Sequence, residues 1–280
     1  MSKIKRMPVR FKHALLVAAV AMLGACQSVQ TTQGGVVGVN RTQRMAVSSA
    51  EIDQASAQQY AQQMAEESAK GTLNRNPAQY ARVRAISARL IRETIAFRPD
   101  AAQWAWEANV ISSPEVNAWC MPGGKIAVYS GLIDKLQVTD DELAAVIGHE
   151  IAHALREHAR ERISRQMGTG ILASIADIVG AQYGVQGVGQ IASAGLDVSM
   201  NLPHSRDQET EADRIGVELA ARAGYNPHAA VTLWQKMGST GGNAPVRWLS
   251  THPSQEDRLR DLTHYSQVVM PLYEQARGRR

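Results

Sequence analysis

Two histidines and a glutamate stand within one short run, His149-Glu150-Ile151-Ala152-His153. In an α-helix, residues four apart share one face, so both imidazoles can point at a single metal ion. Neutral imidazole is a good ligand for Zn²⁺, and a glutamate beside the first ligand can take the proton of a zinc-bound water as general base. The alternative is a pair of surface histidines on an amphipathic helix. The spacing favours a hydrolytic metal site with His149 and His153 as ligands and Glu150 as base.

A catalytic zinc has three protein ligands and one open position, so the third ligand must come from elsewhere in the chain. Glu209 and Glu211 compete for that role in the acidic run after Ser205. The helical face of Glu211 carries charged residues and is expected to be partly solvated. The face of Glu209 carries small or polar residues that let another helix come close, namely Ala212, Asp213 and Gly216. We therefore predict Glu209 as the ligand and Asp213 as acceptor of a ligand histidine's other ring N–H. The alternative for this stretch is a solvated, salt-bridged helix.

Capping signals place both motifs on helices. Thr139-Asp140-Asp141-Glu142 is a capping box, and the apolar face that follows continues through about Arg165. Ser205 caps a second helix that ends near Gly224, a residue suited to the position after a helix. The two helices are expected to bring their functional side chains together.

Other segments indicate a mainly helical fold with a small β-hairpin or sheet. Two β-rich runs, 116–121 and 125–129, flank a Pro-Gly-Gly turn and predict a hairpin. Further helices are expected over 50–70, after Pro77, through Met237 and from Pro253 to about Val269. The Gly/Ala-rich run 168–200 is interpreted as a helical hairpin or mobile flap, with membrane contact as the alternative.

The net charge of +4, from 30 Lys+Arg and 26 Asp+Glu, belongs to the N-terminus. Residues 1–25 contain five bases and no acids, and removing them leaves 25 bases against 26 acids. No basic patch remains for a nucleic acid, so that class of partner is excluded. The two cysteines rule out a disulfide scaffold and a four-cysteine metal cluster.

The N-terminus reads as a secretory signal, because residues 1–13 are basic and the apolar run 14–25 is too short to span a bilayer. Its end, Leu23-Gly24-Ala25-Cys26, resembles a bacterial lipobox; the alternative is an ordinary signal with a chance cysteine. The resemblance implies lipidation at Cys26, and the following Gln27 implies the outer membrane, facing the periplasm. Cys120 is then left as a buried thiol or an intermolecular bridge.

We predict four regions along the chain. They are a lipoprotein signal peptide (1–25), the lipidated Cys26 with a tether and an N-terminal helix (26–75), a domain that contains the predicted hydrolytic zinc site (76–273) and a basic tail (274–280). The tether, residues 27–48, is polar, contains glycine and shows no periodicity.

The HExxH run followed some fifty residues later by Ser205-Arg206-Asp207-Gln208-Glu209-Thr210-Glu211-Ala212-Asp213 resembles the HtpX-type and CAAX-prenyl-protease-type zinc endopeptidases. The periplasmic, lipid-anchored, quality-control members match best. The resemblance implies an α+β, zincin-type metallopeptidase domain built around the HExxH helix, with one Zn²⁺ per chain. It implies that His149, His153 and Glu209 bind zinc, that Glu150 is the base, and that Asp213 supports the site or donates a proton. The edge strand with Asn117, Ala118 and Trp119 is expected to bind extended peptide by strand addition.

The run Ser250-Thr251-His252-Pro253-Ser254 is similar to a segment of the periplasmic relatives, in which the histidine can cover the zinc as a gating fourth ligand. The alternative for His252 is a capped turn. Arg258 is a candidate for transition-state support, with packing or a salt bridge as the alternative.

The sequence as a whole predicts a zinc endopeptidase that cleaves unfolded or misassembled envelope proteins. Its expected partners are those substrates, the membrane through the lipid on Cys26, and the outer-membrane assembly machinery. The second hypothesis is a zinc-bound chaperone or assembly adaptor with little or latent proteolysis; an intact Glu150 argues against it, since a structural site has no use for a base.

Overall fold

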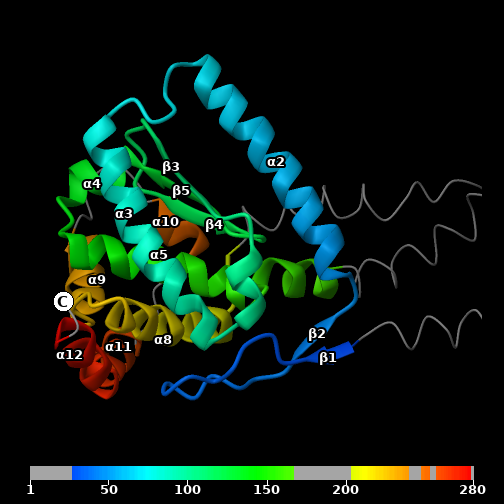
Figure 1. Cartoon of the computed structure of the whole chain (residues 1–280), viewed down its shortest axis with the longest axis vertical. Helices are drawn as coiled ribbons and strands as arrows, with labels where there is room; N and C mark the ends of the chain where they lie inside the picture. Colours follow the sequence, from blue (N-terminus) through cyan, green and yellow to red (C-terminus); the bar gives the residue numbers. More distant parts are fainter. Residues whose placement is uncertain (1–26, 167–202, 240–246, 253–256, 279–280) are drawn as a thin grey trace, which may run out of the picture.

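The computed structural model describes residues 27–166, 203–239, 247–252 and 257–278 (Figure 1). The predictions for the signal peptide, for Cys26 and for the flap over 168–200 lie outside these residues. Within them, the chain is mainly helical with two small sheets, as the sequence predicts.

A three-stranded sheet forms one wall of the domain. The predicted hairpin joins β4 (Ala118–Met121) to β5 (Lys125–Tyr129) in antiparallel register. Gly123 and Gly124 turn the chain with φ of 75° and 83°, values that a residue with a Cβ rarely adopts. The sequence did not predict that β3 (Glu107–Ile111) pairs with β5 in parallel register. The strand order β3-β5-β4 leaves β4 at an edge of the sheet.

Helix α5 (Asp140–Leu155) runs through the centre of the domain, between the sheet and α8 (Arg206–Arg222) (Figure 1). The predicted capping box is present, because the Thr139 hydroxyl accepts from the Glu142 N–H and the Glu142 carboxylate accepts from the Thr139 N–H. Glycines allow the two helices to touch, since a Cβ on Gly216 would lie 2.8 Å from the His149 nitrogen. This contact places the His149–His153 run of α5 beside Glu209 of α8.

The prediction that the first helix continues to Arg165 is wrong in one respect. Helix α5 ends at Leu155, the chain turns at Arg156 and Glu157, and a second helical segment covers 158–166. Glu157 adopts a left-handed φ of 49°, and its carboxylate lies 2.6 Å from Arg98 and 2.5 Å from Arg160. The tertiary pair with Arg98 and the local pair with Arg160 stabilise a break that the unbroken apolar pattern gave no reason to expect.

The interpretation of residues 27–48 as a tether is also wrong. Strands β1 (Gln27–Val29) and β2 (Gln43–Met45) pair antiparallel, and four apolar side chains of the segment are buried: Val37, Val39, Met45 and Val47. Arg41 lies 2.7 Å from Glu161 and 2.5 Å from Glu211. The burial comes from single apolar residues and ion pairs, which periodicity cannot detect.

Helix α2 (Ser49–Ala69) follows, as predicted, and passes beside the sheet (Figure 1). The remaining elements surround the centre: α3 (Pro77–Glu93), η1 (Thr94–Ala96), η2 (Pro99–Gln103), α4 (Ser130–Leu136), α9 (Ala229–Ser239), α10 (Arg247–Thr251), α11 (Arg258–Val268) and α12 (Met270–Gly278). Helix α12 continues to Gly278 and so includes most of residues 274–280, for which the sequence predicted a basic tail. None of the helices in the described ranges combines the length and apolarity needed to cross a membrane.

Candidate active site

Four side chains from three elements converge at the contact of α5 with α8. His149 and His153 project from α5, Glu209 from α8, and His252 comes from the residue after α10. The Nε2 atoms of His149 and His153 are 3.0 Å apart, and they lie 3.7 and 3.5 Å from the Glu209 carboxylate oxygens. The His252 Nδ1 lies 2.9 Å from Glu209 and 3.2 Å from His149. The structure thus brings together all three predicted ligands and His252.

The separations match those of a tetrahedral metal site. Two ligands that are each ~2.0–2.1 Å from a tetrahedral zinc lie about 3.3 Å apart. The Nε2 atoms of His149 and His153 are 3.0 Å apart, and the Glu209 Oε2 and Oε1 lie 3.7 and 3.5 Å from them, respectively. Two imidazole nitrogens and one carboxylate oxygen form a donor set that suits zinc. The residues present therefore fit a zinc ion.

The protonation states of the buried cluster also favour a cation. Burial holds the pKa of His149 and His153 well below the usual value, so both rings are neutral and can act as ligands. Burial acts to raise the pKa of Glu209, but the contacts with His252 and His153 outweigh it, and the pKa lies well below its usual value. A carboxylate and two neutral imidazoles offer lone pairs, rather than protons, to a bound cation.

Glu150 lies beside this cluster and is held by an aromatic residue. The Trp248 indole N–H donates to the Glu150 Oε1 at 2.7 Å, and the His252 Nε2 lies 3.4 Å from the same oxygen. Burial raises the pKa of Glu150 to about 7, although His252 and the Trp248 hydrogen bond act to lower it. A carboxyl group with this pKa can both accept and deliver a proton near neutral pH.

Asp213 and Arg258 support the cluster from behind. The Asp213 Oδ1 lies 2.9 Å from the His149 Nδ1, at an angle that falls short of a hydrogen bond. Arg258 donates to Glu209 and to Asp213, both at 2.7 Å, and its guanidinium lies over the Trp234 ring. Burial raises the pKa of Asp213 to about 6, against the opposing charge of Arg258. The geometry of Arg258 agrees with the salt-bridge alternative.

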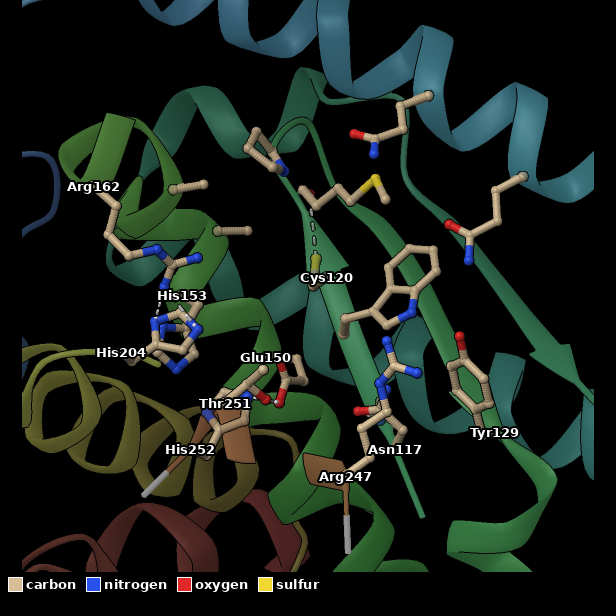
Figure 2. A pocket seen from close by; sticks show the side chains of 18 of the residues that line it. Asn117, Cys120, Tyr129, Glu150, His153, Arg162, His204, Arg247, Thr251 and His252 are labelled. Carbon is tan, nitrogen blue, oxygen red and sulfur yellow. Dashed lines mark hydrogen bonds and ion pairs between the residues drawn. The ribbon is translucent and has the colours of Figure 1, made fainter. Parts of the chain in front are cut away.

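A cleft of about 440 Å³ opens beside the cluster and is shown in Figure 2. One wall is the edge strand β4 with Asn117, and Glu150, His153 and His252 stand at the inner end. Helix α2 also lines the cleft, with five polar side chains, namely Gln59, Gln62, Gln63, Glu66 and Glu67. Cys120 also faces this region; it is a free, buried thiol whose pKa is raised by burial.

Sequence reasoning missed two side chains behind the ligands. His158 belongs to no spacing pattern in the sequence, yet it is fully buried, with its Nδ1 2.8 Å from the His153 Nδ1. Glu211 was expected on a partly solvated face, but it is buried and accepts from Arg41, Arg156 and His158. The break after Leu155 changes the direction of the chain and turns His158 inward. The predicted unbroken helix would have turned it elsewhere.

His204 and Trp248 were also not singled out. The His204 ring is stacked on that of His252, with centroids 4.8 Å apart, and lies tilted against that of His153, with centroids 3.9 Å apart; Arg162 contacts its nitrogens (Figure 2). Each lies just outside a motif, His204 directly before Ser205 and Trp248 two residues before Ser250, so neither belongs to a spacing pattern. The only signal in the sequence was that His204 directly precedes the capping residue Ser205.

A helix with two histidines and a glutamate, joined by a carboxylate from a second helix, defines a zincin-type metallopeptidase. Comparisons with known proteins agree. The profile of Peptidase family M48 matches residues 77–266. The chain belongs to this family of metallopeptidases.

Three relatives illustrate the range of the similarity. The mitochondrial metalloendopeptidase OMA1 of Arabidopsis thaliana is 42% identical over 154 residues, which cover 55% of this chain and 30% of that protein. The metalloprotease LoiP of Escherichia coli is 28% identical over 252 residues, or 89% of this chain and 95% of LoiP. The beta-barrel assembly-enhancing protease of Yersinia pestis is 28% identical over 172 residues, 58% of this chain and 35% of that protein. The chain thus spans about a third of the plant and Yersinia proteins and nearly the whole of LoiP.

Proposed function

We propose that the protein is a zinc-dependent endopeptidase of the bacterial envelope that hydrolyses unfolded or misassembled proteins. The observation that supports this best is the convergence of two imidazole Nε2 atoms, 3.0 Å apart, on the Glu209 carboxylate, whose oxygens lie 3.5 and 3.7 Å from them, with the buried Glu150 beside them and a cleft in front. A zinc ion held by His149, His153 and Glu209 supplies a Lewis acid for the scissile carbonyl and lowers the pKa of water toward ~7.

Glu150 acts as general base in this proposal. It takes the proton of the attacking water and later delivers it to the leaving amine. The Trp248 hydrogen bond fixes the carboxylate that must perform both transfers. Asp213 supports the site through His149 and is the second candidate for proton donation, with a pKa near 6. Arg258 contributes by holding Glu209 and Asp213 in place rather than by contacting the substrate.

The substrate enters as an extended strand. Among the described residues, strand β4 pairs only with β5, and β4 lines the cleft that leads to Glu150. A peptide that pairs with Ala118 and Trp119 would use its main chain for recognition, which favours unfolded segments over folded ones. Asn117, at the start of this edge, extends the same wall of the cleft.

His252 can regulate access to the metal. Its ring lies within bonding range of Glu209 and His149, where a fourth ligand would fill the position that a substrate carbonyl needs. Replacing it with alanine opens that position. We expect His252→Ala to cleave casein faster than the wild type at equal zinc content; slower cleavage would show that the ring is needed for catalysis.

Anchoring by a lipid on Cys26 at the periplasmic face of the outer membrane is supported by the lipobox-like sequence alone. Two or more acyl chains would give stable attachment. A role with outer-membrane assembly machinery is supported by the similarity to the Yersinia beta-barrel assembly-enhancing protease. Cys26→Ser tests the anchor: the variant should leave the membrane fraction and no longer incorporate radiolabelled palmitate.

The activity itself is tested by cleavage of casein by the full-length chain in mild detergent. We expect cleavage that stops on chelation and returns when one equivalent of zinc is added. A protein that binds zinc, fails to cut casein or other unfolded proteins, and yet suppresses their aggregation would support the chaperone or adaptor function instead.

A further inference from the structure

A line of three buried side chains extends behind the proposed metal ligand His153. The His153 Nδ1, on the far side of the ring from Glu209, lies 2.8 Å from the His158 Nδ1. The His158 Nε2 lies 3.0 Å from the Glu211 Oε2. His158 is fully buried and Glu211 is 6% exposed, so water does not compete for these contacts. The three residues come from α5, from the helical segment after its break, and from α8.

Only one arrangement of protons serves both this line and metal binding. A metal ligand needs the lone pair of the His153 Nε2, so the proton of the neutral ring is on Nδ1. That N–H then donates to the His158 Nδ1, which must be unprotonated. The His158 proton is consequently on Nε2, from which it donates to Glu211. Each donor faces an acceptor, and the line ends on a carboxylate.

The far end of the line is held by two guanidinium groups. Arg156 donates to the Glu211 Oε2 at 2.9 Å, and Arg41 donates to the Oε1 at 2.5 Å. Arg156 also donates to the Arg41 carbonyl, at 2.9 Å, which ties the two arginines together. These contacts keep Glu211 ionised and fixed, as the acceptor at the end of such a line must be.

We infer that His158 and Glu211 are positioning residues that fix the tautomer and the ring orientation of His153 as a metal ligand. This inference rests on the proposed function, in which His153 binds zinc. It gives the second histidine of the motif a hydrogen-bonded partner on Nδ1, whereas the Asp213 carboxylate beside the His149 Nδ1 falls short of hydrogen-bond geometry. Partners of this type commonly change metal affinity by about 10- to 100-fold when they are removed.

A second metal ion among His153, His158 and His204 is the competing interpretation, because their nitrogens also lie within 4.8 Å of one another. Two observations argue against it. The Arg162 guanidinium contacts both ring nitrogens of His204 and places a fixed positive charge there. In addition, a second metal would require both nitrogens of the His153 ring to bind metal, which leaves no nitrogen to carry the ring's proton. The line to Glu211 requires neither a second ion nor the loss of that proton.

The test measures zinc affinity of the full-length chain by competition with a chromophoric chelator. His158→Leu removes both hydrogen bonds and preserves most of the volume. His158→Asn retains an oxygen that can accept from His153 but cannot reach Glu211. The control is His228→Leu, which removes a histidine that contacts Ser266 away from the site. We expect the zinc Kd to rise by about 10- to 100-fold for His158→Leu, less for His158→Asn, and less than twofold for the control.

A spectroscopic readout separates positioning from a general loss of structure. In the zinc-loaded wild type, the ¹⁵N-labelled His153 should show a hydrogen-bonded Nδ1 proton at low field, and this signal should vanish in His158→Leu. If His158→Leu does not fold, as judged by circular dichroism of the zinc-free protein, Glu211→Gln takes its place. Glu211→Gln preserves the shape of the side chain and removes its charge. We expect the zinc Kd of this variant to rise by about 3- to 10-fold.

The outcomes distinguish the inference from the function on which it rests. An unchanged zinc Kd in His158→Leu, with casein cleavage intact in the wild type, would overturn the inference alone. A second equivalent of zinc in the wild type that is lost in His158→Leu would also overturn it, in favour of the second metal site. A wild type that binds no zinc would overturn both.

Discussion

Gly216 sets the distance between the two helices that carry the metal ligands. A Cβ at this position would lie 2.8 Å from the His149 nitrogen, 2.9 Å from the His149 Cα and 3.0 Å from the Gly148 carbonyl carbon. All three are main-chain atoms of α5, which cannot turn aside as a flexible side chain can. Gly216→Ala must therefore push α8 away from α5 by about half an ångström to restore ordinary contact distances.

The expected change in stability is the difference of two terms. Alanine in a helix interior is better than glycine by about 1 kcal/mol. Overpacking against a rigid neighbour costs about 1–3 kcal/mol. We expect Gly216→Ala to lower the free energy of unfolding by about 1 kcal/mol. Gly238, near the end of α9, is the matched control, because a Cβ there would meet no atom of the described residues outside its own helix within 4 Å. Gly238→Ala should raise the free energy of unfolding by up to about 1 kcal/mol.

The assay is urea unfolding of both variants without zinc, followed by a zinc titration. Because Glu209 moves with α8 while His149 and His153 stay on α5, Gly216→Ala should also bind zinc at least about tenfold more weakly, as expected for a displaced ligand. Gly238→Ala should bind zinc as the wild type does. If Gly216→Ala is as stable as Gly238→Ala and binds zinc equally well, the close approach of the helices does not position the site.

Three further predictions follow from other contacts. Contacts with Arg41 and Gln43 hold the pKa of Glu161 below its usual value despite burial, so this carboxylate stabilises the fold above about pH 5 and the stabilisation is lost as the pH falls. Arg41→Gln should therefore lower the free energy of unfolding by about 2 kcal/mol at pH 7. Between about pH 7 and pH 3 the free energy of unfolding of the variant should fall less steeply than that of the wild type. Equal pH dependence of the two free energies would contradict this. Trp248→Phe removes the hydrogen bond to Glu150, which should raise the pKa of that carboxyl and move the acid limb of the kcat/KM profile to higher pH with unchanged zinc content; an unmoved limb would refute it. Removing zinc with a chelator should lower the Tm by about 10 °C relative to protein with free zinc at a thousandfold excess over its Kd. An unchanged Tm after addition of the chelator would exclude a metal bound in the native state.

The parts of the site that depend on local spacing were predictable from the sequence. His149, Glu150 and His153 are close in the chain and lie on one helix, whose start the Thr139 capping box predicts. The choice of Glu209 followed from the small residues on its face, and the glycine contact with α5 shows the physical reason. The β4–β5 hairpin was likewise fixed by its own turn.

The parts that depend on tertiary contacts were not predictable. His158 faces the site only because the chain breaks at Glu157, and ion pairs to Arg98 and Arg160 hold this break. The segment 27–48 joins the domain through scattered contacts such as those of Arg41, which leave no periodic trace. The parallel pairing of β3 with β5 joins segments separated by the hairpin strand, and no local signal encodes it.

The most direct test of hydrolysis by this site is one comparison, casein cleavage and zinc content of Glu150→Gln beside the wild type. The substitution preserves the size of the side chain and removes its ability to take a proton, while the three zinc ligands remain. Glu150→Gln should hold one zinc per chain and cleave at least about a hundredfold more slowly, the smallest effect expected for the loss of a general base. Cleavage by zinc-loaded Glu150→Gln at the wild-type rate would show that Glu150 is not the base and that the proposed chemistry is wrong.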